Sequence, residues 1–185
     1  RDRDHIGGNN TLKNKFSAKI LASENDRERI PEIDIFLSDG QIWKDDIFEF
    51  KVISVPGHTM GHICFYFFNE KIVFTGDTLF SLGCGRVFEG SNEDMFNSLT
   101  KLKSLPPITK VYFGHEYTLN NSIFCSKFDE NNSELDRKII DIKKKLNNGL
   151  PTVPSSIKDE LDCNIFLRAK TLKEFSKLRD LKDNF

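Results

Sequence analysis

The spacing of apolar residues changes near Tyr117, and this change restricts the folds open to the chain. Before Tyr117, short apolar runs are broken by Gly, Asp and Pro, as in strands joined by loops. After Tyr117, apolar residues recur three or four positions apart, as in amphipathic helices. We therefore predict an α/β domain over residues 1–117, followed by a helical domain over residues 118–185.

Apolar runs and turn residues predict the individual strands of the first half. Residues 63–68 and 71–75 flank Asn69-Glu70, which predicts an antiparallel hairpin. Further strands are expected at residues 18–22, 33–37, 48–55 and 111–113.

Helix signals occur in both halves. Ser91 and Asp94 form a capping-box pattern, which predicts a helix that begins at Ser91. Residues 133–146 carry one apolar stripe and stop shortly before Gly149, as an amphipathic helix does. Other helices are expected after Gly7-Gly8-Asn9, over residues 155–161 and over residues 172–181.

Composition and charge argue against several classes of protein. The chain has 185 residues, 38% of them hydrophobic, which is enough to bury a core. A formal net charge of -1 gives no general attraction to nucleic acid or to anionic membranes. No apolar run approaches the roughly 18 residues of a spanning helix. Because the first residues do not resemble a signal peptide and the cysteines form no CxxC pair, we expect a cytoplasmic protein with reduced thiols. We also expect a monomer.

Every histidine of the chain stands beside Gly, Asp or Glu at a predicted strand end or turn. The histidine segments are Asp4-His5-Ile6-Gly7, Gly57-His58-Thr59, Gly61-His62 and Gly114-His115-Glu116. A similar turn, Gly76-Asp77-Thr78, carries an aspartate. Loops at strand ends can converge on one point, and imidazole nitrogens and carboxylate oxygens are ligands that zinc, iron or manganese accept. A single histidine is more often a surface or core residue. Four in such turns, together with two aspartates, predict a metal centre.

The order of these segments resembles the metallo-β-lactamase superfamily: D-H, then G-H-T-x-G-H, then T-G-D-T, then G-H-E. Residues 79–90 (LFSLGCGRVFEG) and 114–118 (GHEYT) resemble one family within it, glyoxalase II, the hydroxyacylglutathione hydrolases. The resemblance implies an αββα sandwich and a helical domain that binds glutathione. Similarity to that helical domain extends over residues 151–156, 164–168 and 178–185.

The resemblance also implies two divalent metal ions, zinc or alternatively iron or manganese. Asp4, His5 and His115 would hold one ion. His58 would help to hold the other, and Asp77 would bridge the two. Asp4 and Asp77 would then be the catalytic residues, with Asp4 also orienting the nucleophile.

The implied reaction is hydrolysis of S-(2-hydroxyacyl)glutathione, chiefly S-lactoylglutathione, to a 2-hydroxy acid and glutathione. In such a centre the two ions would lower the pKa of a coordinated water and so supply a hydroxide for attack on the thioester carbonyl. His62 is not a ligand in this scheme but orients the neighbouring loop. Because glutathione carries two carboxylates, cations are expected beside the metals. The family positions for substrate contacts are Arg86, Phe88 (a tyrosine in some members), Tyr117, Asn121, Arg179 and Lys182.

The start of the chain departs from the family's first metal motif, H-x-H-x-D-H. Asp2 stands where the second histidine belongs, as a substitute carboxylate ligand, and the first histidine would precede Arg1. We therefore expect the sandwich to be truncated at its amino terminus, which would leave apolar faces and sheet edges open. Two alternatives remain open: a glutathione persulfide dioxygenase of the same superfamily that uses one iron, and an inactive fragment or degenerate homologue.

Overall fold

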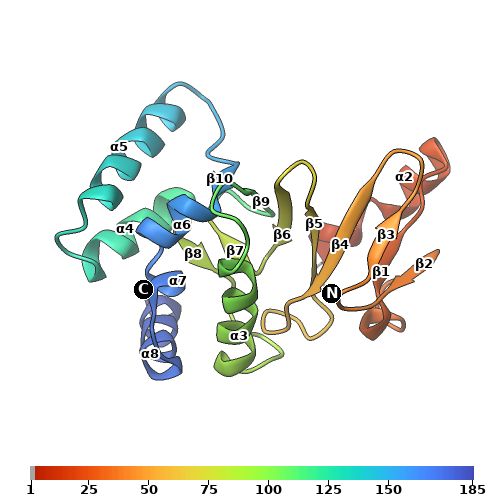
Figure 1. Ribbon diagram of the computed structural model, residues 1–185, viewed down its shortest axis with the longest axis horizontal. Helices are drawn as coiled ribbons and strands as arrows, with labels where there is room; N and C mark the ends of the chain where they lie inside the picture. The colour runs from red at the N-terminus through yellow and green to blue at the C-terminus, as the bar shows by residue number, and fades with distance from the viewer. Residues whose placement is uncertain (1–2) are drawn as a thin grey trace.

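The computed structural model describes residues 3–185, including the side chains of residues 5–185. A six-stranded sheet forms the centre of this structure, in the strand order β10-β9-β6-β5-β4-β3 (Figure 1). The predicted hairpin around Asn69-Glu70 is confirmed, since β5 and β6 pair antiparallel. The strands of this sheet are β3 (Ile42–Lys44), β4 (Glu49–Ser54), β5 (Ile63–Phe67), β6 (Ile72–Gly76), β9 (Lys110–Phe113) and β10 (Ser155–Ser156).

The strand directions bring three loops to one edge of this sheet. β6 and β9 pair in parallel, so the loops that follow them leave the sheet at the same edge. β5 is antiparallel to β6, and β4 is antiparallel to β5, so the loop joining β4 to β5 lies at that edge too. This edge therefore collects residues 55–62, 77–78 and 114–117.

A second, smaller layer of strands packs on one face of the six-stranded sheet. β1 (Leu21–Ser23) and β2 (Ile35–Leu37) pair in parallel, and Leu37 packs with Phe50 and Val52 of β4 in a small core. β1 begins later than the strand predicted over residues 18–22. The short elements at this end of the molecule are α1 (Arg3–Ile6), α2 (Asn9–Phe16) and the 3-10 turn η1 (Glu24–Asp26).

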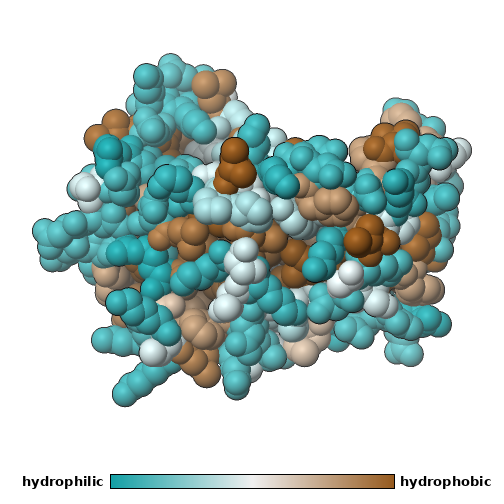
Figure 2. Space-filling model, in the orientation of Figure 1, coloured by the Kyte–Doolittle hydropathy of each residue, from teal (hydrophilic) through white to brown (hydrophobic). Residues whose placement is uncertain are grey.

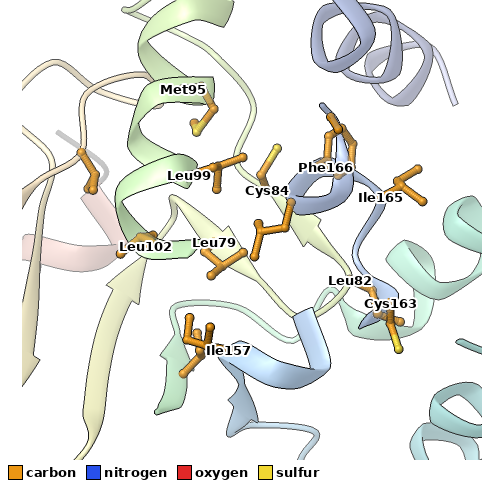
Figure 3. Close-up of a cluster of buried hydrophobic side chains, with 14 of the residues drawn as sticks. Leu79, Leu82, Cys84, Met95, Leu99, Leu102, Ile157, Cys163, Ile165 and Phe166 are labelled. Atoms are coloured by element: carbon orange, nitrogen blue, oxygen red, sulfur yellow. The ribbon is translucent and has the colours of Figure 1, made fainter. Parts of the chain in front are cut away.

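The main core lies on the other face of the sheet. α3 (Asn92–Lys103) begins with the predicted capping box, in which Ser91 and Asp94 exchange hydrogen bonds between side chain and backbone. Met95, Leu99 and Leu102 of α3 point into the core (Figure 3). A two-stranded hairpin, β7 (Leu79–Phe80) and β8 (Gly83–Cys84), lies beneath this helix.

Helices make up the chain after Tyr117, as predicted, and they complete the main core. One boundary is wrong: a helix is predicted from Ser155, yet Ser155–Ser156 form β10 beside β9, and Ser156 caps a helix that begins at Ile157. α4 and α7 are not predicted individually. The helices are α4 (Thr118–Phe128), α5 (Ser133–Asn147), α6 (Ile157–Cys163), α7 (Ile165–Arg168) and α8 (Leu172–Asp183). The α/β sandwich with a helical carboxy-terminal region is thus confirmed.

The surface is largely hydrophilic on the face seen in Figure 2, with hydrophobic residues gathered in a band across its middle. Within the part of the chain that the structure describes, no helix combines the length and apolar character needed to cross a membrane. Phe74 and Tyr112 stack on each other in the sheet, with ring centroids 5.3 Å apart, and Phe74 is exposed.

Candidate metal centre

Three histidines surround one aspartate at the sheet edge that collects the loops. His5 comes from α1, His58 from the loop after β4, and His115 from the loop after β9. Asp77 directly follows β6 and is buried. These are the histidines and the aspartate that the sequence singles out as ligands.

The Oδ2 atom of Asp77 is the point on which the three rings converge. It lies 3.1 Å from Nε2 of His5, 3.4 Å from Nε2 of His115 and 3.5 Å from Nε2 of His58. The Nε2 atoms of His5 and His115 are themselves 3.2 Å apart. Ligand atoms of His5, Asp77 and His115 all lie within 4.8 Å of one another, which is close enough to share one ion.

The chemistry of this cluster fits divalent metal ions. Imidazole nitrogens and carboxylate oxygens are the donors that zinc and similar ions take. The other carboxylate oxygen of Asp77, Oδ1, is buried and has no hydrogen-bond partner among the described residues. A buried acceptor without a partner costs free energy, and a cation would relieve that cost. Two predicted ligands cannot be assessed in this way, because Asp2 and the side chain of Asp4 lie outside the described residues.

His58 is oriented by a backbone carbonyl. Its Nδ1 lies 2.8 Å from the carbonyl oxygen of Arg86, where it can only donate, so Nε2 is left as the acceptor that faces Asp77. Gly85, the residue before Arg86, allows this close approach, because a Cβ there would overlap the carbonyl oxygen of Asp77. Such outer hydrogen bonds fix the tautomer and direction of a ligand ring.

His62 holds the backbone of Asp77 instead of joining the cluster. Its Nε2 accepts the Asp77 N–H at 3.3 Å. Burial, and then the neighbouring His58, lower the pKa of His62, so the ring is neutral at physiological pH. Gly76 has a φ of 49°, and a Cβ on it would lie 2.6 Å from Nε2 of His62. This placement matches the orienting role predicted for His62.

Glu89, which the sequence analysis did not single out, holds the loop that contains His58 and His62 in place. Glu89 accepts the Met60 N–H at 3.0 Å and pairs with Arg29 at 2.7 Å, and the Glu89 carboxylate raises the pKa of the Arg29 guanidinium. Gly90 donates to the carbonyl of Gly57 at 3.0 Å. Glu89 lies within the family string at residues 79–90, but nothing in that string alone marks it as a loop anchor.

Two predicted substrate residues flank the histidines with aromatic rings. Tyr117 stacks on His115, with ring centroids 5.0 Å apart and planes 16° from parallel. Phe88 lies 5.1 Å from the ring of His58. Both side chains are more than half exposed, Tyr117 at 51% and Phe88 at 64%, so they are accessible beside the cluster.

The predicted basic residues lie near the end of α8. Arg86 donates to the Asp183 side chain at 3.2 Å and to its carbonyl at 3.1 Å. Lys182 lies 3.3 Å from Oδ1 of Asn120 and over the ring of Phe124; burial first, then Arg179, lower its pKa.

Arg179 and Asn121, by contrast, are buried against the β7–β8 hairpin. Arg179 donates to the carbonyl of Cys84 at 2.9 Å and also pairs with Asp183. Asn121 donates to the carbonyl of Ser81 at 3.1 Å. Cys84 is buried, and burial raises the pKa of its thiol, so its predicted role in packing fits better than one as a nucleophile.

A solved structure shares this fold. The crystal structure of ETHE1 from Myxococcus xanthus superposes with a TM-score of 0.69 and 25% sequence identity. The match covers 97% of this chain and 64% of that one.

The fold and the histidine–aspartate centre define a protein of the metallo-β-lactamase superfamily, whose sequence model matches residues 2–115. The model of the hydroxyacylglutathione hydrolase C-terminus matches residues 116–185. The hydroxyacylglutathione hydrolase of Pelagibacter ubique (strain HTCC1062) is 58% identical over 182 residues, and that of Brucella ovis is 44% identical over 182 residues. The chain belongs to the hydroxyacylglutathione hydrolase family. It spans 76% of the length of the first relative and 71% of the second.

Proposed function

We propose that this chain hydrolyses S-(2-hydroxyacyl)glutathione, such as S-lactoylglutathione, to a 2-hydroxy acid and glutathione. The observation that carries the proposal is the approach of three imidazole nitrogens to within 3.5 Å of one buried carboxylate oxygen. Membership of the hydroxyacylglutathione hydrolase family supports thioester hydrolysis as the reaction of this cluster.

The superfamily binds divalent metal ions, and we propose zinc here, with iron or manganese as alternatives. Asp4, His5 and His115 are proposed to hold one ion. His58 and Asp77 are proposed to hold the other, with Asp77 shared and Asp2 as an additional carboxylate. When bound, such ions lower the pKa of a coordinated water and polarise a carbonyl, which is the chemistry that thioester hydrolysis needs.

Side chains around this centre position its proposed ligands, and no protein side chain is proposed to act as the nucleophile. Asp77 is the proposed bridging and catalytic carboxylate, and Asp4 is proposed to orient the attacking water. His58 donates to the Arg86 carbonyl and the Asp77 N–H donates to the His62 ring, and these hydrogen bonds support the positions of His58 and Asp77. The buried Cys84 thiol donates to no base among the described residues, which supports hydrolysis without a covalent protein intermediate.

The glutathione part of the substrate is proposed to lie across Tyr117 and Phe88 towards the basic end of α8. Arg86 and Lys182 would form ion pairs with its carboxylates, since both cationic side chains lie at that end of α8. Asn121 and Arg179 belong to the same proposed set. Because both already donate to the hairpin, contact with glutathione requires them to share or exchange those bonds.

We further propose that the chain divides into a metal-binding domain over residues 1–117 and a glutathione-binding domain over residues 118–185. The family models support this division, since one ends at residue 115 and the next starts at residue 116. A cytoplasmic location and a monomeric state are also proposed. Light scattering on the purified chain tests the monomer directly.

Hydrolysis of S-lactoylglutathione by the zinc-loaded chain tests the proposed function. We expect turnover, and we expect His115→Ala to lower kcat/KM by more than about 100-fold, since even outer partners of metal ligands contribute 10–100-fold. Lys144→Ala, on the exposed face of α5, serves as the control and should keep full activity.

Turnover no faster than buffer would sink the proposal for this chain and favour an inactive homologue. Oxygen consumption by the iron-loaded chain with glutathione persulfide, without thioester hydrolysis, would instead favour the dioxygenase.

A further inference from the structure

The segment between the proposed ligand Asp77 and the proposed substrate residue Arg86 is held by side chains of the helical region. This segment contains the β7–β8 hairpin, and each carbonyl from Phe80 to Gly85 lies within hydrogen-bond distance of such a side chain. The donors are Asn164 to Phe80 (3.4 Å) and Gly83 (3.1 Å), Asn121 to Ser81 (3.1 Å), the Cys125 thiol to Leu82 (3.2 Å), and Arg179 to Cys84 (2.9 Å) and Gly85 (3.5 Å).

The turn of this hairpin depends on one buried carboxyl group, that of Glu160 in α6. Leu82 sits at the turn with a φ of 60°, a conformation that costs energy for a residue other than glycine. Its N–H donates to Oε2 of Glu160 at 2.8 Å, and Asn164 donates to the same oxygen at 2.9 Å. The other carboxyl oxygen bonds to the Ser155 hydroxyl. Glu160 is 0% exposed, so every one of its polar contacts is with the protein.

Apolar packing fixes the same hairpin between two helical segments. Leu79, Leu82 and Cys84 lie between α3 and the α6–α7 segment (Figure 3). The hairpin side chains therefore cannot move without disturbing the main core, and its backbone cannot turn without losing the bonds to the helical region.

Both ends of the hairpin contact the metal centre. Gly85 donates to the carbonyl of Thr78 at 3.1 Å and packs against the backbone of Asp77. The next residue, Arg86, supplies the carbonyl that orients His58. A shift of the hairpin would therefore move the Asp77 backbone and turn the ring of His58.

We propose that Glu160 is a positioning residue of the metal centre: through the Leu82 N–H it holds the hairpin that sets Asp77 and orients His58. This proposal rests on the proposed metal-dependent function. Burial raises the pKa of Glu160, which favours the neutral acid. Oε2 accepts from Leu82 and Asn164, and Oε1 accepts from the Ser155 hydroxyl. Glutamine keeps the acceptor for Leu82 and Asn164, and its amide nitrogen can donate to the Ser155 hydroxyl, which also accepts hydrogen bonds.

Zinc affinity, measured by competition with a chelator, tests the proposal without reference to catalysis. We expect Glu160→Met, which keeps the volume but removes the acceptor, to weaken zinc binding by about 10-fold or more, as lost outer partners do. Glu160→Gln should stay within about threefold of the wild type. Asn164→Ser provides a second test if Glu160→Met does not fold. It keeps a cap for α7 but removes the amide donors, and it should weaken zinc binding in the same direction.

Leu37→Ala in β2 controls for loss of stability, because Leu37 is buried in the small core with Phe50 and Val52, which is separate from the main core that contains the hairpin. It should lower the melting temperature and leave zinc affinity unchanged. The proposal is overturned if folded Glu160→Met or Asn164→Ser binds zinc as the wild type does, or if Glu160→Gln is as impaired as Glu160→Met. A wild-type chain that binds zinc but does not hydrolyse the thioester would overturn the proposed function alone.

Discussion

Two glycines at the metal centre have as definite a role as the proposed ligands. Gly76 and Gly85 lie where a Cβ would meet His62 or the Asp77 backbone. The absence of a side chain lets the β6 loop, His62 and the Arg86 segment approach one another. The histidines and Asp77 could be predicted from short local strings, but the reason for these glycines could not, because it depends on residues brought together by the sheet.

Gly76→Ala should damage the centre, whereas Gly149→Ala should not. Both glycines have positive φ, 49° and 66°, but only Gly76 has a neighbour within 4 Å of the added Cβ. We expect Gly76→Ala to displace His62 and weaken zinc binding about 10-fold or more. Gly149→Ala should cost about 1–2 kcal/mol of stability through its backbone conformation and leave zinc affinity intact. Chelator competition and urea unfolding measure the two effects, and equal zinc affinities in the two variants would contradict this account.

Elements with a local signal were predicted well, and elements defined by tertiary contacts were not. The β5–β6 hairpin, the capping box of α3 and the apolar stripe of α5 were each predicted from neighbouring residues. α4 was not predicted because polar residues such as Asn121 are buried along with Phe124, so no single stripe is visible. Glu160 could not be recognised for a related reason: its partner Leu82 lies 78 residues earlier.

The buried carboxyl of Glu160 should also make the stability of the hairpin region depend on pH. Its pKa is raised, mainly by burial, and Lys138 is the charged group that opposes this shift. The folded state therefore holds the proton more tightly than the unfolded state. The resulting stability is fully present below about pH 4.5, the ordinary pKa of glutamate, and is lost as pH rises through the folded pKa.

Glu160→Gln removes this titration, so its stability relative to the wild type should increase with pH above 4.5, by at most about 1.4 kcal/mol per pH unit. Urea unfolding of both proteins between pH 5 and pH 8 measures the difference. A difference that does not change with pH would show that Glu160 titrates normally in the folded chain.

At the scale of the whole molecule, the sheet and the helical region share the task of building one site. The sheet edge supplies His58, Asp77 and His115, while the helical region supplies the donors that hold the hairpin next to them. Sequence patterns predicted the α/β sandwich and the helical region that follows it. They did not predict that the buried polar residues of the second region serve the metal centre of the first.

Metal binding should stabilise the whole fold. An ion that binds only the folded state at 100 times its Kd adds about 2.7 kcal/mol of stability. For a chain of this size that raises the melting temperature by about 5–10 °C. Thermal unfolding in zinc and in chelator measures the shift, and His115→Ala should show a much smaller one. An equal shift in the variant would place the stabilising ion elsewhere.

The order in which the chain is made has a consequence for the β7–β8 hairpin. Its carbonyls bond to Asn121, Cys125, Asn164 and Arg179, which follow their partners by 40 to 95 residues. When the loop that follows β6 has just been synthesised, none of the residues that donate these hydrogen bonds has been synthesised yet. Asp77 is synthesised early, but the hydrogen bonds that fix the segment beside it are complete only after Arg179 has emerged.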